Sequence, residues 1–222
     1  MDESRGLSSH IKIEFKRALT DRCVEVLVKG YQSMISANQY SLSWEEEQFS
    51  AHLISHMEHL NEVNQYRMDI IPEPRLYDEE VVEGKKSPKK SPKADIRICM
   101  WSNNTWSTPV KFVYIIEAKN LSERDWKKES DSKVIAKAQK KRYIETGIDH
   151  FISGHYPEGC LAGYVVQGDP DKIVLDINEI LRQKSPSRES EILGDKESVY
   201  SYPNCYRSKH SNGALRHFLL KL

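Results

Sequence analysis

The 222-residue sequence predicts an α/β domain in which a central mixed sheet of four or five strands carries helices on both faces. Residues 112–116 form a continuous run of aromatic and β-branched side chains, which is typical of a strand buried on both faces. Residues 94–100 alternate apolar and polar side chains and indicate a neighbouring strand. Helical periodicity on both sides of this pair, at 11–35, 44–60 and 134–144, completes the prediction.

Composition restricts the range of functions. The chain has 33 Lys plus Arg and 33 Asp plus Glu, so it has no global positive field and any nucleic-acid binding depends on local clusters. The four cysteines form no CxxC pair, which argues against a zinc knuckle and suits a reducing cytoplasm. The chain shows no basic-then-apolar leader and no apolar run of ~20 residues, so we expect a cytoplasmic protein without a membrane partner.

We expect residues 1–40 to form a helical extension and residues 41–222 to form the main domain. Apolar side chains recur every four residues from Phe15 to Tyr31, which predicts one long helix over 11–35. Gly30 is unfavourable for the last turns of that helix because glycine has a low helix propensity.

The helix expected at 44–60 carries Glu46 on the same face as Phe49 and Leu53, so the carboxylate points toward the interior. Two interpretations of Glu46 are open. It closes a capping box with the backbone of Ser43, or it belongs to a functional site.

Three histidines, His52, His56 and His59, lie on one side of the same helix. Histidine clusters can form zinc sites, but no cysteine or further histidine is close in sequence. We therefore favour a partly exposed polar face over a metal site at these positions.

Residues 66–71 read as a strand ended by prolines, and residues 84–93 form a Ser-Pro-Lys repeat that predicts a flexible loop. The repeat resembles the SPKK segments of histone tails. Two interpretations are open: a solvated loop, or a clamp in which Lys89, Lys90 and Lys93 contact a phosphate backbone.

The pair of strands at 94–100 and 112–116 brings charged residues to one end. Glu117 and Lys119 follow the buried strand at positions that point to the same side, and Asp95 starts the neighbouring strand. In a hairpin, Asp95 and Glu117 would face each other, and two such carboxylates repel unless a cation lies between them. Mg²⁺ prefers hard oxygen ligands of this kind, and the Ala118 carbonyl is a further candidate.

The helix after Lys119 places Gln139 and Tyr143 four residues apart on one face, around the basic run Lys140, Lys141 and Arg142. A buried strand at 163–166 and a helix at 171–181 follow. We expect residues 185–197 to be a polar loop, and the segment 205–220 to return as a final strand that covers a sheet edge.

The order of these residues resembles the PD-(D/E)xK nuclease superfamily. Asp95 matches its first acidic residue, Glu117 its second, and Lys119 its lysine, while Glu46 matches the glutamate that many members carry on an early helix. Gln139 and Tyr143 match the QxxxY pattern of the RecB-like branch. The sequence departs from the pattern at the leading proline, where it has Ala94.

The resemblance spans about residues 44–181 and implies a restriction endonuclease-like fold and Mg²⁺-dependent hydrolysis of phosphodiesters, with Mn²⁺ as a substitute. It implies DNA more than RNA as substrate, and a setting in bacterial or phage defence. It assigns the metal to Asp95, Glu117 and the Ala118 carbonyl, and water positioning to Lys119. Glu46 would assist the metal, while Gln139 and Tyr143 would orient the substrate or the lysine.

Two alternatives belong to other classes. The chain can be a catalytically silent member of the fold that binds nucleic acid or a protein, or a structural protein in which Glu117 and Lys119 form a strand-end ion pair. The sequence does not determine whether the protein acts as a homodimer or needs an activating partner protein.

Overall fold

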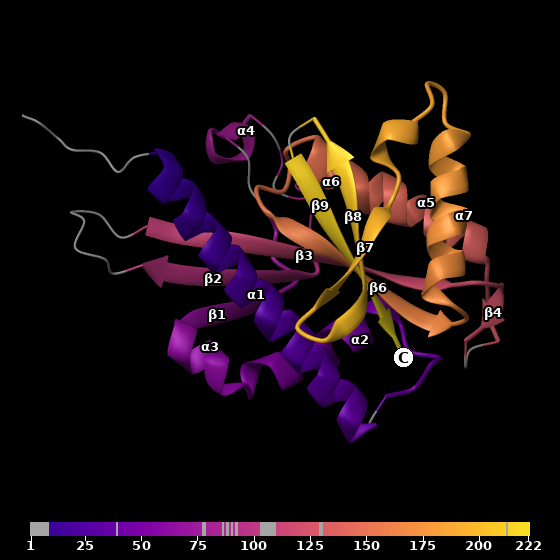
Figure 1. Ribbon diagram of the computed structural model, residues 1–222, viewed down its shortest axis with the longest axis horizontal. Helices are drawn as coiled ribbons and strands as arrows, with labels where there is room; N and C mark the ends of the chain where they lie inside the picture. The colour runs from indigo at the N-terminus through magenta and orange to yellow at the C-terminus, as the bar shows by residue number, and fades with distance from the viewer. Residues whose placement is uncertain are drawn as a thin grey trace, which may run out of the picture.

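The computed structural model describes residues 9–38, 40–76, 79–85, 87, 89, 91, 93–102, 110–128, 131–211 and 213–222. The predicted α/β class is confirmed, because seven strands form one mixed sheet with helices on both faces (Figure 1). Its strands are β1 (Met68–Pro72), β2 (Ile96–Ser102), β3 (Val110–Ser122), β6 (Gly159–Gln167), β7 (Gly194–Val199), β8 (Tyr202–His210) and β9 (Gly213–Lys221). A separate two-stranded ribbon consists of β4 (Trp126–Lys127) and β5 (Lys133–Val134).

The order of strands across the sheet is β1-β2-β3-β6-β9-β8-β7. The first three strands form an antiparallel meander, β6 is parallel to both β3 and β9, and β8 and β7 continue antiparallel. The predicted hairpin of β2 and β3 is confirmed, with Ile96 opposite Ile116. This register brings Asp95, one residue before β2, opposite Glu117, which with Lys119 lies within β3 and does not follow it as expected, because the strand continues to Ser122.

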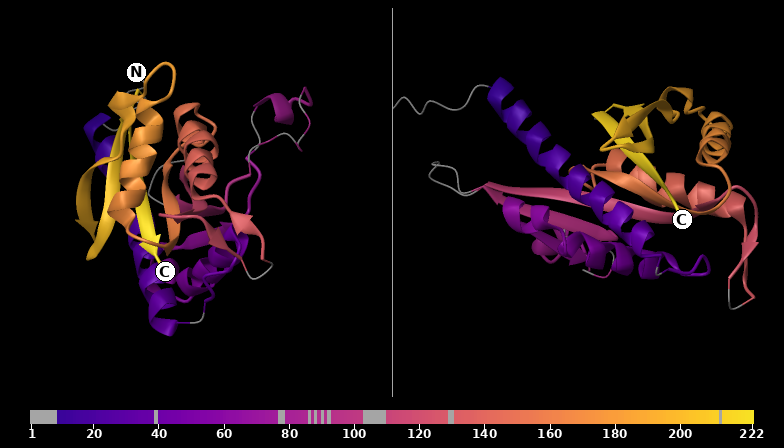
Figure 2. Two further views of the ribbon diagram at one scale, coloured as in Figure 1. Left: turned by 90° about the vertical axis from the view of Figure 1, so that its right-hand side faces the viewer. Right: turned by 60° about the horizontal axis from the view of Figure 1, so that its bottom comes forward.

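The helices form two layers, which Figure 2 shows on opposite sides of the sheet. One layer consists of α1 (Ser9–Ala37), α2 (Glu46–Glu58) and α3 (Asn61–Tyr66). The other consists of α5 (Ala136–Arg142), a π-helical segment η2 (Tyr143–Ile148), α6 (Asp149–Ile152) and α7 (Pro170–Arg182). Two short helices, α4 (Glu79–Val82) and η3 (Glu189–Glu191), lie in the connections.

Each layer covers its own hydrophobic cluster, because residues along a strand alternate between faces. Tyr114, Ile116 and Ala118 of β3 pack with the α1 layer, whereas Ile115 and Leu121 pack with the other layer. The predicted long helix is confirmed as α1. Its buried residues belong to the same cluster as the strands, so the segment that we expected to be an extension contributes to the common core.

Two glycines permit close approaches that a side chain would prevent. Gly30 lies against α2, where an added Cβ would be 2.4 Å from Met57 Cγ, so this glycine serves the contact of α1 with α2 and does not end the helix. Gly159 lies where β6 meets β3, and an added Cβ would be 1.9 Å from the carbonyl oxygen of Ile115. The pairing of the two strands therefore requires glycine at 159.

The expected strand count was too low, and the reason lies in the C-terminal third. The expected loop at 185–197 ends in a strand, because residues 194–197 belong to the edge strand β7, whose sequence is polar since much of it faces solvent. The expected single final strand is two strands, β8 and β9, of which β9 lies inside the sheet beside β6.

The described cysteines are all buried and free of disulfides: Cys23, Cys99, Cys160 and Cys205. In the part of the chain that the structure describes, the helices are too short or too polar to span a bilayer.

Candidate functional site

The candidate site lies where β3 leaves the β2–β3 hairpin. Asp95 accepts a hydrogen bond from the backbone N–H of Ala118 through Oδ2, at 2.6 Å. This bond fixes the first carboxylate beside the strand that carries Glu117 and Lys119. The predicted juxtaposition of Asp95 with Glu117 and Lys119 is therefore present in the structure.

The ammonium of Lys119 is surrounded by oxygens from three parts of the chain. Its Nζ lies 2.7 Å from Glu117 Oε1, 3.2 Å from Glu46 Oε1 and 3.6 Å from Asp95 Oδ2. It also donates to the Ala118 carbonyl at 2.5 Å. The side chains of Lys119 and Glu117 are each only 4% exposed, so these charges interact largely out of water.

Glu46 takes part in this cluster and does not cap its helix. The N-cap of α2 is Glu45, which forms a reciprocal capping box with Gln48. The capping role for Glu46 is therefore wrong. Glu46 instead contacts Lys119 through Oε1 and accepts the backbone N–H of Asn120 through Oε2, at 3.2 Å.

A tyrosine that the sequence did not indicate holds the second carboxylate. Tyr156 donates its hydroxyl to Glu117 Oε2 at 2.9 Å, and the hydroxyl oxygen of Tyr156 lies 3.1 Å from Nδ1 of His150. Tyr156 is buried and comes from the connection between α6 and β6, 39 residues after Glu117. No spacing rule links positions so far apart, so the sequence alone carries no signal for it.

Burial dominates the protonation of these groups. It raises the pKa of Glu117 to about 7, against the opposing charge of Lys119, and it raises the pKa values of Asp95 and Glu46 as well. Burial acts to lower the pKa of Lys119, but the three carboxylates outweigh it, and the net pKa is above its usual range. The cluster therefore keeps a charged ammonium among carboxyl groups that hold their protons more tightly than usual.

A small pocket of about 110 Å³ adjoins Glu46 and includes Gln139 and Arg142 of α5. Two amide oxygens in it, Asn120 Oδ1 and Gln139 Oε1, are buried without a hydrogen-bond partner. Asn120 is oriented by its amide nitrogen, which donates to the carbonyl of Trp44 at 3.1 Å. The structure thus brings Gln139 next to the cluster. The other residue of α5 that lines this pocket is Arg142, three positions later, and not the expected Tyr143.

Tyr143 lies elsewhere. It is fully buried in the cluster under α7, and its hydroxyl lies 2.9 Å from His217 Nδ1 on β9. His217 Nε2 in turn lies 2.7 Å from Ser208 Oγ. Because the ring packs into the core one turn beyond Gln139, the structure gives Tyr143 a contact with His217 and none with Lys119.

The predicted basic contacts are divided among different surroundings. Lys140 is buried and pairs with Asp176 of α7 at 2.5 Å, so the expected nucleic-acid contact is wrong for this residue. Lys141 is exposed and lines a different pocket, beside Lys184. Lys93 pairs with Glu73 at 2.6 Å and Lys89 is exposed, while Lys90 lies outside the described residues.

The three helix histidines make local contacts. His56 Nδ1 lies 2.9 Å from Ser33 Oγ, His59 Nδ1 lies 2.6 Å from the carbonyl of Ser55, and His52 packs edge-on against Trp44. Within the described part of the chain, no group of three or more His, Cys, Asp or Glu residues is placed to hold a metal ion. In the carboxylate cluster, the Lys119 ammonium occupies the central position.

Comparisons with protein-family models, with curated proteins and with solved structures gave no match to this chain.

Proposed function

We propose that this protein is a Mg²⁺-dependent nuclease of the PD-(D/E)xK type with a restriction endonuclease-like fold. The observation that carries the proposal is the cage of four oxygens, from Glu46, Asp95, Glu117 and Ala118, within 3.6 Å of Lys119 Nζ. Acidic side chains from helix α2, from the residue before β2 and from within β3 meet at one lysine, in the chain order that the sequence resemblance implies. The meander β1-β2-β3, followed by helix α5 and the parallel strand β6, supports the finer fold assignment.

The donors suit the proposed metal in kind. Asp95, Glu117 and the Ala118 carbonyl supply hard oxygens, which Mg²⁺ and Mn²⁺ prefer, and one or two carboxylates usually suffice because water and substrate complete the shell. A bound Mg²⁺ would polarise the scissile phosphate and lower the pKa of water. For the oxygens to be shared in this way, the Lys119 ammonium must withdraw from the centre of the cage.

The surrounding residues support distinct tasks. Lys119 remains protonated at neutral pH because its pKa is raised by the three carboxylates, so it can neutralise charge that develops on a phosphate. Tyr156 fixes the rotamer of Glu117, and the Asn120 backbone fixes Glu46. Gln139 and Arg142, in the adjoining pocket, can hold a neighbouring phosphate or sugar.

The substrate in this proposal is DNA more than RNA. The net charge of zero means that approach of the polyanion depends on local groups, among which Arg142 lines the pocket that adjoins Glu46. Exposed Lys89 and Lys141 are further candidates for phosphate contact.

The test is cleavage of supercoiled plasmid and of single-stranded DNA with Mg²⁺, with Mn²⁺ and with EDTA. Wild type is compared with Asp95→Asn, with Lys119→Met and with Asp69→Asn, an exposed carboxylate of β1 that serves as the matched control. We expect metal-dependent cutting that both site variants lose, by at least about 100-fold, and that the control retains.

Calorimetric titration with Mg²⁺ separates the outcomes. Metal binding that Asp95→Asn abolishes, without any cleavage by wild type, would favour the catalytically silent alternative. Absence of both binding and cleavage would overturn the nuclease proposal.

A further inference from the structure

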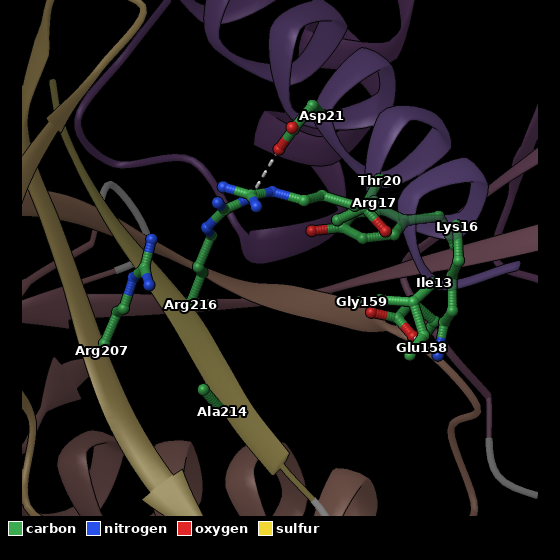
Figure 3. A pocket seen from close by; sticks show the side chains of 11 residues that line it. Ile13, Lys16, Arg17, Thr20, Asp21, Glu158, Gly159, Arg207, Ala214 and Arg216 are labelled. Atoms are coloured by element: carbon green, nitrogen blue, oxygen red, sulfur yellow. Dashed lines mark hydrogen bonds and ion pairs between the residues drawn. The ribbon is translucent and has the colours of Figure 1, made fainter. Parts of the chain in front are cut away.

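A second cavity, of about 410 Å³, lies between α1, the hairpin β8–β9 and the start of β6 (Figure 3). Basic side chains from three elements line it, namely Lys16 and Arg17 of α1, Arg207 of β8 and Arg216 of β9. In Figure 3, Arg17 and Arg216 extend toward each other from opposite walls. Two guanidinium groups that converge in this way repel unless an anion lies between them.

Acidic neighbours hold two of these arginines in place. Glu197 accepts from Arg207 at 2.9 Å and lies 3.5 Å from Arg216 Nε, so one carboxylate braces both. Asp21 lies 3.4 Å from Nη1 of Arg216. Arg17 has no acidic partner among the described residues, and its charge is available to a ligand.

A buried hydroxyl provides independent support. Tyr114 of β3 is 0% exposed and lines the cavity, and its hydroxyl makes no hydrogen bond of ordinary geometry, although the weakly accepting thiol of Cys160 is near. An unsatisfied buried hydroxyl is costly, at about 1–3 kcal/mol. A ligand oxygen in the cavity would satisfy it.

This cavity is separate from the carboxylate cluster. Tyr114 and Glu117 differ by three positions on β3, so their side chains leave opposite faces of the strand. Tyr114 belongs to the cluster under α1, and Glu117 contacts Tyr156 on the other face. A molecule bound among the arginines would therefore not contact the carboxylates.

We propose that this cavity binds a small anion that carries a phosphate group, such as a pyrophosphate or a nucleoside monophosphate. Guanidinium forks match phosphate oxygens in geometry and form charge-assisted hydrogen bonds with them. The volume lies within the range of small-molecule sites, and Ile13 and Ala214 offer apolar wall to the body of the ligand. A concave pocket of this size suits a compact ligand better than a nucleic-acid backbone, which runs along open surface.

Isothermal titration of the full chain with sodium pyrophosphate and, separately, with adenosine monophosphate tests the proposal. EDTA is present throughout, so the carboxylate cluster and its metal play no part, and the result does not depend on the nuclease proposal. The variants are Arg17→Gln and Tyr114→Phe, with Lys12→Gln as the matched control, because Lys12 is an exposed cation of α1 that does not line the cavity. Circular dichroism and melting temperature establish that each variant is folded.

We expect saturable binding of at least one probe, weakened about tenfold or more by Arg17→Gln, several-fold by Tyr114→Phe and less than twofold by Lys12→Gln. Absence of binding by folded wild type would overturn the proposal, as would equal weakening by Arg17→Gln and Lys12→Gln, which indicates only general attraction to α1. A duplex oligonucleotide is titrated in parallel. If it alone binds, and Arg17→Gln weakens it, the face is a nucleic-acid interface and the small-anion site is overturned.

Discussion

Replacement of Lys119 by methionine would remove the one cation from the centre of the carboxylate cluster while it keeps a side chain of similar length. Glu46, Asp95 and Glu117 would remain, largely out of water and without compensation. Loss of one partner of a buried ion pair costs about 3–5 kcal/mol. For a chain of this length each kcal/mol corresponds to roughly 2–4 °C in melting temperature.

The loss of unfolding free energy in Lys119→Met depends on pH, and the pKa values of the carboxyl groups determine whether the loss grows or shrinks as pH rises. Burial raises the folded-state pKa of Glu117 to about 7, compared with an ordinary value of 4.5, so the folded protein holds a proton that the unfolded chain releases in this window. Stability therefore falls as pH rises from 4.5 toward 7, by up to about 1.4 kcal/mol per pH unit for one group. Without Lys119 the three pKa values rise further, and the variant is expected to be closest to wild type near pH 5 and furthest from it near pH 8.

The assay is urea unfolding of both proteins at pH 5 and at pH 8, in EDTA and in Mg²⁺. The control is Lys140→Met, because Lys140 is equally buried but pairs with the half-exposed Asp176, outside the cluster. Both variants are expected to have a lower free energy of unfolding than wild type at pH 8, but only for Lys119→Met should this difference from wild type shrink at pH 5. If the unfolding free energy of Lys119→Met lies below that of wild type by the same amount at both pH values, the electrostatic account of the cluster is refuted.

Three further predictions rest on other contacts. Gly159→Ala should lower the free energy of unfolding by at least about 2 kcal/mol, because its Cβ would meet the Ile115 carbonyl, and chemical denaturation measures this against Gly194→Ala, where the space is open. Burial lowers the pKa of His217 to about 3, so its contribution to stability is full above the ordinary pKa of 6.5 and is lost at up to about 1.4 kcal/mol per unit as pH falls toward 3. His217→Gln should therefore show a flatter acid limb of the stability curve than wild type. Tyr156→Phe removes the hydrogen bond to Glu117 Oε2 and should lower the free energy of unfolding by about 1–2 kcal/mol, measured in urea at pH 8. An unchanged free energy of unfolding would show that the hydroxyl does not stabilise Glu117.

The central part of the fold was accessible from the sequence because local patterns specify it. Period-two alternation at 94–100 and a continuous apolar run at 112–116 led to β2 and β3, and the hairpin then placed Asp95 beside Glu117 and Lys119. The helical periodicity that predicted α1 and α7 is likewise a local property.

The parts that the sequence did not reveal depend on distant contacts or on exposure. Strand β7 resembles a loop because an edge strand can remain polar, and only its pairing with β8 identifies it. Tyr156 reaches Glu117 through the folding of a connection, and Tyr143 turns away to His217 on a strand that was not foreseen as an interior strand. Gln139 lies beside the carboxylate cluster and Tyr143 does not, because the packing of this helical segment against the sheet decides which of its side chains reach the site.

The ammonium of Lys119, at the centre of the oxygen cage, offsets the negative charge of the carboxylates in the folded protein without a bound metal ion. A metal ion that enters this site competes with a covalently attached cation whose local concentration is fixed, so affinity for the free ion is reduced by that competition. A polyanionic substrate shifts the balance, because it offers the displaced ammonium a new partner. Under the proposed function, metal and substrate would then bind with positive cooperativity, and an enzyme of this kind would stay metal-free until its substrate arrives.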